Sequence, residues 1–162
     1  MPVKSNKVDI ASSIVLLHNV GLGQNLTDDE LTLIARIMEP HVFQPEEAIF
    51  EEDSLARDVY LLEHGKVSIR IKHPSTPDKE EVLHNLHDGE IFGELALVDG
   101  SPRSATVRVE DEARIHVFPY EAIMDLMDLN PLLGYKLMRN IARIIANRVR
   151  NTNMMWRCTL IW

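Results

Sequence analysis

The spacing of apolar residues changes twice along the chain, from helical to alternating and back. Apolar side chains recur every three or four positions over residues 8–18 and 28–39, which predicts two short helices. Thr27 and Glu30 have the spacing of a capping box at the start of the second helix, and Pro40 is expected to end it. From residue 41 to residue 118 the pattern alternates, as in β-strands.

Seven short runs carry this alternating pattern. They are HVF at 41–43, AIFE at 48–51, DVYLLEH at 58–64, KVSIRIK at 66–72, EEVLHNL at 80–86, SATVRVE at 104–110 and ARIHVF at 113–118. Short strands separated by Gly, Pro and Asp are typical of an antiparallel sandwich or barrel. Gly65 predicts a tight hairpin between the third and fourth runs, and the polar segment 74–79 predicts a longer one.

Two helices are expected after the strands. Pro119 opens a short helix that Asn130 and Pro131 end, and a longer helix spans 132–152. One apolar face of the longer helix consists of Leu133, Leu137, Ile141 and Ile144, and a second consists of Met138, Ala142, Ile145, Val149, Thr152 and Trp156. We expect one face to cover the barrel. The second would cover a ligand or a second protomer, or would also pack on its own chain.

Composition places the chain among single-domain globular proteins, with 162 residues of which 45% are apolar and 26% are charged. It contains no apolar run of membrane-spanning length and its start does not resemble a secretory signal, so a cytoplasmic location is expected. The single cysteine, Cys158, excludes an internal disulfide and a four-cysteine metal site.

Charge is distributed unevenly along the chain. The net charge is −8, with −14 over residues 1–130 and +6 over residues 131–162. This acidic balance argues against nucleic-acid binding by the chain as a whole.

The segment GEIFGELALVDGSPRSATV, residues 89–107, interrupts the strands and carries the candidate chemistry. Gly93 permits a close backbone approach, and the ELAL that follows it can form one helical turn whose N–H groups attract an anion. Arg103 offers a planar fork that suits phosphate, while Ser104 and Ala105 add a hydroxyl and an unobstructed N–H.

Glu94 adds a second kind of recognition to this segment. A carboxylate repels phosphate but accepts hydrogen bonds from sugar hydroxyls, and a sugar beside a phosphate indicates a nucleotide. The simpler interpretation of Glu94 and Arg103 is an internal ion pair, and both interpretations can hold together.

The segment closely resembles the phosphate-binding cassette of the cyclic nucleotide-binding domain family, which includes cAMP receptors and regulatory subunits. The matching residues are Phe92, Gly93, Glu94, Leu95, Ala96, Leu97, Pro102, Arg103, Ala105 and Thr106. The resemblance spans residues 14–152 and implies a mainly β fold, an eight-stranded antiparallel jelly-roll barrel with N-terminal helices and a C-terminal helix pair. It divides the chain into an N-terminal helical segment (1–40), a barrel (41–118) that holds the cassette, and hinge and lid helices (119–162).

The resemblance also implies a non-catalytic sensor that binds a cyclic nucleotide, requires no cofactor and transmits its occupancy through the C-terminal helices. The expected ligand-binding residues are Leu83, Phe92, Gly93, Glu94, Leu95, Ala96, Arg103, Ser104 and Ala105, with Arg143 and Arg148 as candidate lid residues. Ser104 stands where the family has Ala with cAMP, often Thr with cGMP, and Ser in bacterial cAMP receptors, so cAMP is favoured over cGMP.

The expected partners are a second copy of the chain, bound through helix 132–152, and an unidentified effector protein. The alternative function is a protein-interaction or assembly module on the same fold with an unoccupied pocket. Direct DNA binding is not expected, because no helix-turn-helix segment follows the last helix.

The chain departs from the family pattern at two turns, and its sequence does not indicate a metal site or an enzyme. Glu47 and the pair Glu52-Asp53 stand near the second and third strands, where the family often has glycine, which affects loop geometry. His84 and His87 are three residues apart in a strand pattern, so they are expected on opposite faces, and no metal site is predicted. No nucleophile or base constellation indicates an enzyme.

Overall fold

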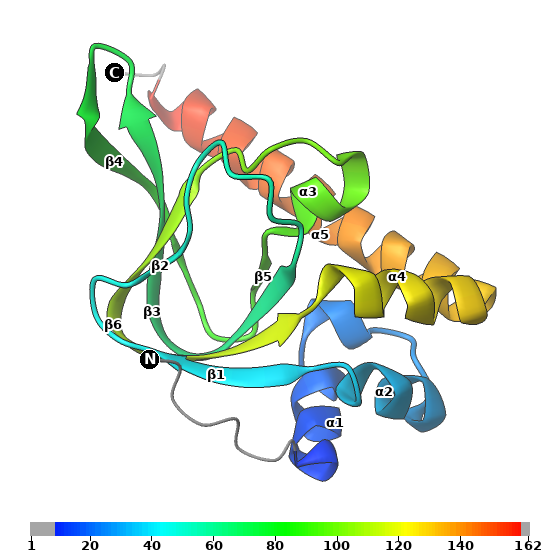
Figure 1. The fold of residues 1–162 in the computed structure, drawn as a ribbon. Coiled ribbons are helices and arrows are strands. Elements are labelled where there is room, and N and C mark those ends of the chain that lie inside the picture. Colours follow the sequence, from blue (N-terminus) through cyan, green and yellow to red (C-terminus); the bar gives the residue numbers. More distant parts are fainter. Residues whose placement is uncertain (1–8, 160–162) are drawn as a thin grey trace.

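The computed structural model describes residues 9–159 and consists of an antiparallel barrel with helices packed at one end (Figure 1). The helices are α1 (Ile10–His18), η1 (Gly21–Gly23), α2 (Asp28–Ala35), α3 (Glu94–Asp99), α4 (Tyr120–Leu129) and α5 (Pro131–Thr159). The predicted capping box of α2 is present, because the Thr27 side chain accepts from the Glu30 N–H and the Glu30 carboxylate accepts from the Thr27 N–H.

The strands of the described residues form one antiparallel sheet that curls into the barrel. They are β1 (Glu39–Phe43), β2 (Ala48–Phe50), β3 (Val59–His73), β4 (Thr76–Leu86), β5 (Ile91–Phe92) and β6 (Thr106–Phe118). The sheet has the order β1-β6-β3-β4, with β2 also paired to β6 and β5 to β3. The predicted fold class, a mainly antiparallel jelly roll with flanking helices, is confirmed.

The predicted hairpin at Gly65 is wrong, because Gly65 lies inside the continuous strand β3. A Cβ atom on Gly65, whose φ is +128°, would lie 2.6 Å from Ala113 Cα on β6. The β3–β6 register shifts on both sides of Gly65, so the glycine permits a bulge where two strands approach closely. The runs 104–110 and 113–118 likewise join into β6, which leaves fewer and longer strands than predicted.

Two helix boundaries also differ from the prediction. Helix α2 ends at Ala35, and Pro40 belongs to β1, where proline is tolerated because β1 is an edge strand. Helix α5 begins at Pro131 and reaches Thr159, beyond the predicted end at residue 152. Proline suits the first position of a helix, since the N–H that it lacks would have no intrahelical partner there.

Of the two predicted boundaries between segments, one coincides with the end of an element and the other does not. The boundary after residue 40 falls inside β1, whereas the one after residue 118 coincides with the end of β6. The outer ends of the predicted segments, residues 1–8 and 160–162, lie outside the described residues. The three-part division stays a prediction.

Helix α5 packs on the helical end of the barrel with its first apolar face. Leu133, Leu137 and Ile141 are buried in a cluster shared with α1, α2 and α4. The second face divides: Met138 and Ile145 pack half-buried against the same cluster. Ala142 and Val149, from the same second face, are exposed. Most of the second face up to Ile145 is therefore used within the chain.

Polar contacts fix the beginning of α5 to the N-terminal helices. The Lys136 ammonium lies 2.7 Å from one oxygen of the Glu30 carboxylate, and this hydrogen bond holds the pKa of Glu30 below its usual value. The buried Asn140 amide donates to the carbonyls of Leu22 and Gln24 at 2.8 and 2.9 Å. The first half of α5 is thus firmly anchored.

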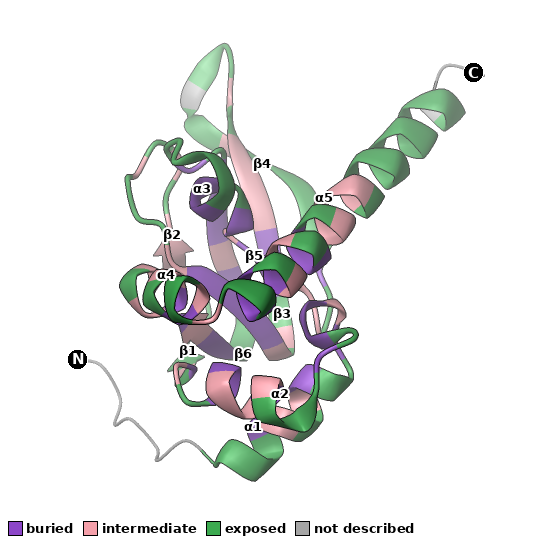
Figure 2. Ribbon diagram, turned by 90° about the vertical axis from the view of Figure 1, so that its right-hand side faces the viewer, coloured by how far each residue is buried: buried purple, intermediate pink, exposed green. Residues whose placement is uncertain are grey.

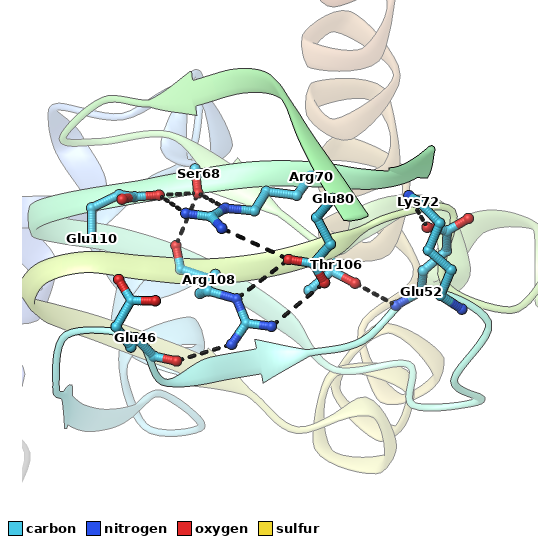
Figure 3. Close-up of polar contacts among 9 residues, drawn as sticks. All are labelled: Glu46, Glu52, Ser68, Arg70, Lys72, Glu80, Thr106, Arg108 and Glu110. Carbon is cyan, nitrogen blue, oxygen red and sulfur yellow. Dashed lines mark hydrogen bonds and ion pairs between the residues drawn. The ribbon is translucent and has the colours of Figure 1, made fainter. Parts of the chain in front are cut away.

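The two turns that depart from the family pattern contain left-handed backbone at non-glycine residues, Glu46 with φ 67° and Asp53 with φ 68°. We expect Glu46→Gly to stabilise the fold by about 1 kcal/mol and to raise Tm by about 2–4 °C, because glycine adopts this conformation without strain. The Glu46 carbonyl, which accepts from Arg108 at 3.0 Å, is retained in the variant (Figure 3).

Glu47→Gly is the matched control for thermal unfolding. The Glu47 carboxylate accepts from the Gln44 N–H at 2.9 Å and its φ is not positive, so glycine is expected to lower Tm there. A Glu46→Gly variant that unfolds at or below the Tm of the parent would contradict the strain argument.

Candidate functional site

A cavity of about 410 Å³, its open mouth included, lies where the cassette meets the barrel. Segments that are distant in the sequence form its wall: Phe50, Ile69, Phe92, Gly93, Glu94, Leu95, Ala96, Arg103, Ser104, Ala105, Val107 and Arg148. Most of these residues belong to the cassette, and α5 contributes one.

The backbone turns sharply at Gly93 to bring the cassette into the cavity wall. Gly93 has φ 77°, in the left-handed region, and is the N-cap residue of α3. A Cβ atom on Gly93 would lie 2.7 Å from Arg103 Nη1 and 3.0 Å from the Asp58 carbonyl oxygen. Glycine is therefore required for both the conformation and the close approach of Arg103.

Arg103 is held rigidly although its side chain is long. It is 3% exposed, and its Nη1 and Nη2 atoms donate to the carbonyls of Gly93 and Asp58 at 2.6 and 2.7 Å. The guanidinium carbon lies 4.1 Å from the centre of the Phe50 ring, a cation–π contact. Burial lowers the pKa of Arg103, while the nearby Tyr60 acts in the opposite direction.

The turn at residues 51–54 holds the Arg103 backbone and is itself tied to the barrel. The Arg103 N–H donates to the Ser54 carbonyl, and the Asp53 N–H donates to the Arg103 carbonyl, both at 2.8 Å. The Glu52 N–H donates to Thr106 Oγ1 at 3.1 Å (Figure 3). The turn thus holds both the N–H and the carbonyl of Arg103, and the barrel holds the turn.

Three buried side-chain nitrogens in the described part of the chain have no hydrogen-bond partner: Arg103 Nε, Arg148 Nε and His116 Nδ1. The two arginines both line the cavity. An unsatisfied buried donor costs about 1–3 kcal/mol, and more when the group is charged. A cavity lined by two arginines favours an anionic group.

Glu94 is buried in the same wall, at 2% exposure, and its partner is Arg148. Arg148 Nη1 donates to Glu94 Oε1 at 2.6 Å, and Arg148 Nη2 donates to the Ile91 carbonyl. The simpler interpretation of the sequence, an ion pair between Glu94 and Arg103, is wrong. The Arg103 guanidinium donates to two backbone carbonyls instead, and Glu94 pairs with Arg148.

A family model for the cyclic nucleotide-binding domain matches residues 40–130. The chain belongs to the cyclic nucleotide-binding domain family. It is 30% identical over 134 residues to the Cyclic AMP receptor protein of Thermus thermophilus, an alignment that covers 82% of this chain and 59% of that protein. The chain therefore spans less than two thirds of the length of this relative.

Solved structures share the fold of this cyclic nucleotide-binding domain. A cyclic nucleotide-binding domain from Methylobacillus flagellatus has a TM-score of 0.79 at 18% identity, covering 93% of this chain and 84% of the other. The regulatory domain of Toxoplasma gondii PKA, co-crystallised with cAMP, has a TM-score of 0.67 at 20% identity, covering 80% and 50%.

Two of the residues predicted for the ligand site lie outside the cavity. Leu83 is 55% exposed, its neighbours in β4 are exposed too, and it has no partner in the β3–β4 register, which steps from Ile69–His84 to Arg70–Val82. The other is Arg143.

Arg143 faces the N-terminal helices. Its guanidinium donates to Gln24 Oε1 at 2.8 Å and to Asn140 Oδ1 at 3.2 Å. Arg148, the other candidate lid residue, does line the cavity, together with all the predicted cassette residues. Their roles toward a ligand stay predictions.

Three cavity residues of the domain were missed by the sequence analysis: Phe50, Ile69 and Val107. Val107 and Ala105 are two residues apart in the predicted strand 104–110, so strand alternation could have identified Val107. The same alternation from the buried Val67 points to Ile69. Phe50 reaches the cavity only through the pairing of β2 with β6, which no local signal encodes.

The predicted separation of His84 and His87 is wrong, because β4 ends at Leu86 and the alternation ends with it. Their ring centroids lie 6.2 Å apart. Within residues 9–159, no group of three His, Cys, Asp or Glu side chains is arranged to hold a metal ion. No helix in the same range combines the length and the apolar character needed to cross a bilayer.

Proposed function

We propose that this domain is a non-catalytic sensor that binds a cyclic nucleotide, cAMP in preference to cGMP, in the cassette cavity. The observation that carries the proposal is the buried Arg103, which lines the same cavity as the buried Glu94 and whose Nε has no hydrogen-bond partner. A cation and a carboxylate side by side suit a ligand that presents both an anionic phosphate and hydroxyl donors.

In the proposed complex, the cyclic phosphate lies against Arg103 and the first turn of α3, and the ribose 2′-hydroxyl donates to Glu94. The base then lies toward the apolar side chains of Ile69 and Val107, which also line the cavity. In this arrangement the polar phosphate and ribose lie against polar residues, and the base lies against apolar ones.

The preference for cAMP is supported by Ser104, an exposed cassette residue, and by the relatives. One relative is named a cyclic AMP receptor, and a structural neighbour was co-crystallised with cAMP. Because these two proteins are named a receptor and a regulatory domain, they also support a non-catalytic role for this chain.

A thermal-shift series with cAMP, cGMP and AMP tests the proposal. A ligand that binds only the folded state stabilises it by about 2.7 kcal/mol at 100 times its Kd, which corresponds to a rise in Tm of several degrees. We expect the largest rise with cAMP, a smaller one with cGMP and little with AMP. The absence of a rise with both cyclic nucleotides would refute the proposed ligand class and favour the assembly module.

We further propose that the C-terminal helices transmit occupancy to an effector protein and that the end of α5 pairs with a second copy of the chain. Val149, which belongs to the second apolar face of α5, is 55% exposed, and the helix projects beyond the barrel (Figure 2). Apolar side chains on a projecting helix favour association with another helix. The cytoplasmic location and the absence of direct DNA binding stay predictions.

Sedimentation tests the pairing. In a dimer through this part of α5, Val149→Glu would bring like charges together in an apolar seam, so the variant is expected to sediment as a monomer while the parent is a dimer. Asn151→Glu adds the same charge about 200° around the helix and should leave the dimer intact. A parent that is monomeric with and without cAMP would rule out the dimer.

A further inference from the structure

Two apolar residues of the cavity wall, Ile69 on β3 and Val107 on β6, are partners in the register of these strands. Successive side chains of a strand point to opposite faces of its sheet, so the residues that flank this pair lie on the face turned away from the cavity. The flanking residues are Ser68 and Arg70 on β3, and Thr106 and Arg108 on β6. Polar and charged side chains therefore lie behind the apolar wall.

Arg70 is at the centre of a hydrogen-bonded network on that face (Figure 3). Its Nε donates to Ser68 Oγ at 2.9 Å, and its Nη2 donates to Glu110 Oε1 at 2.6 Å. The Ser68 hydroxyl donates to the same Glu110 oxygen. The hydrogen bonds from Ser68 and Arg70 hold the pKa of Glu110 below its usual value. The three side chains thus fix one another in place.

Glu80 connects the strand β4 to the same network. Within residues 9–159, β4 pairs with β3 alone. Glu80 Oε2 lies 3.8 Å from Arg70 Nη1 and 3.5 Å from Arg108 Nε, so one carboxylate bridges arginines of β3 and β6. Arg108 Nη1 also donates to the Glu46 carbonyl at 3.0 Å. The network therefore joins three strands behind the wall.

The backbone ladder is irregular at the point that the network holds. The β3–β4 register shifts between Ile69 and Arg70, which leaves this part of β3 less constrained by strand pairing. The side chains of the four charged residues are only 20–25% exposed. Linked ion pairs that are shielded from water are stronger and more directional than exposed ones. The network supplies the constraint that the ladder lacks there.

We propose that Arg70 is a positioning residue of the nucleotide site, which holds Ile69 and Val107 against the base and so determines the preference for adenine over guanine. This inference rests on the proposed function, since that function places the base against these two side chains. Guanine carries more polar groups on its Watson–Crick edge than adenine. A closely fitted apolar wall leaves these groups unpaired, which penalises guanine more.

Calorimetric titration of cAMP and cGMP into Arg70→Met tests this role. Methionine keeps the length of the side chain and removes its donors. Because a gap of about 0.5–1 Å forfeits about a quarter to a half of a close contact, cAMP is expected to bind about 3–10-fold more weakly. The affinity for cGMP should fall less, since water that enters the loosened wall pairs with the polar groups of guanine.

The ratio of the affinities for cAMP and cGMP is the decisive readout, and it is expected to fall by about threefold. A change that only lowers the folded or binding-competent fraction weakens both ligands by the same factor and leaves their ratio as in the parent. A ratio equal to that of the parent would overturn the positioning role.

Arg114→Met is the matched control. Arg114 on β6 pairs with Glu63 on β3 at 3.2 Å, so this change also removes an arginine–glutamate pair between the same two strands. Arg114 is exposed and does not line the cavity. Both affinities, and their ratio, should equal those of the parent.

Arg70→Lys provides a second variant if Arg70→Met does not fold. Lysine keeps the charge but lacks the fork that donates to Ser68 and Glu110 together. We expect a smaller fall in the affinity ratio than with methionine. No fall in the variant that folds would contradict the proposal.

Methyl NMR of Ile69 and Val107 tests the positioning without any nucleotide. Arg70→Met is expected to lower the order parameters of both side chains, whereas Arg114→Met should leave them as in the parent. Order parameters that stay unchanged in a folded Arg70→Met variant would overturn the proposal.

The two measurements separate this inference from the function on which it rests. If the parent binds cAMP and the affinity ratio is the same in Arg70→Met, the positioning role fails and the sensor stands. If neither protein binds a cyclic nucleotide, the proposed function fails and the role toward the base fails with it. The order parameters then show whether Arg70 still holds the wall.

Discussion

Replacing Arg103 with alanine is expected to weaken cAMP binding by at least about 30-fold, because truncating one partner of a buried charge pair costs about 2–5 kcal/mol. Arg103 is the buried cation assigned to the phosphate, and its position is fixed by two backbone carbonyls and the Phe50 ring. Arg103→Lys keeps the charge but loses the planar fork, so a loss is expected there too, smaller than that of alanine.

Calorimetry measures both variants, with circular dichroism to establish that each is folded. Arg57→Ala is the matched control, since Arg57 is an exposed arginine beside Tyr120 and does not line the cavity. The control should bind cAMP like the parent. If a folded Arg103→Ala variant also binds cAMP like the parent, the assignment of the phosphate to the cassette is wrong.

Changing Glu94 to glutamine is expected to reduce the discrimination between cAMP and its 2′-deoxy analogue. A hydrogen bond to a charged acceptor contributes about 1.5–3 kcal/mol, so the parent should prefer cAMP by roughly 10-fold or more. Glutamine presents a neutral acceptor, and the preference should fall several-fold. The ratio of the two affinities is the readout because loss of the ion pair with Arg148, which this change also causes, affects both ligands alike.

Equilibrium competition against a fluorescent cyclic nucleotide gives the four affinities that this comparison needs. Equal preference for cAMP over the 2′-deoxy analogue in the parent and in Glu94→Gln would contradict the role of Glu94. It would leave the role of Arg103 intact, since the phosphate is present in both ligands.

The cassette could be predicted because its chemistry is contiguous in the sequence. Gly93, Glu94 and Arg103 lie within eleven residues, and the turn that joins them is determined by a glycine with positive φ. The capping box at Thr27 and the helix start at Pro119 are local signals of the same kind. In each case the residue that determines the structure is next to the structure it determines.

The elements that could not be predicted depend on contacts between distant residues. A glycine between two strand-like runs fits a hairpin or a bulge equally well, and only the approach of Ala113 distinguishes them at Gly65. The partner of Glu94 lies 54 residues away on a helix whose spacing indicates a face but not a target. Leu83 lies outside the cavity, on a stretch of β4 that is exposed and whose register with β3 contains a bulge.

Calorimetric titration of cAMP into the parent chain tests the central claim most directly. The account predicts saturable binding of one nucleotide per chain, weaker binding of cGMP and no comparable binding of AMP. A folded chain that takes up neither cAMP nor cGMP saturably would contradict it.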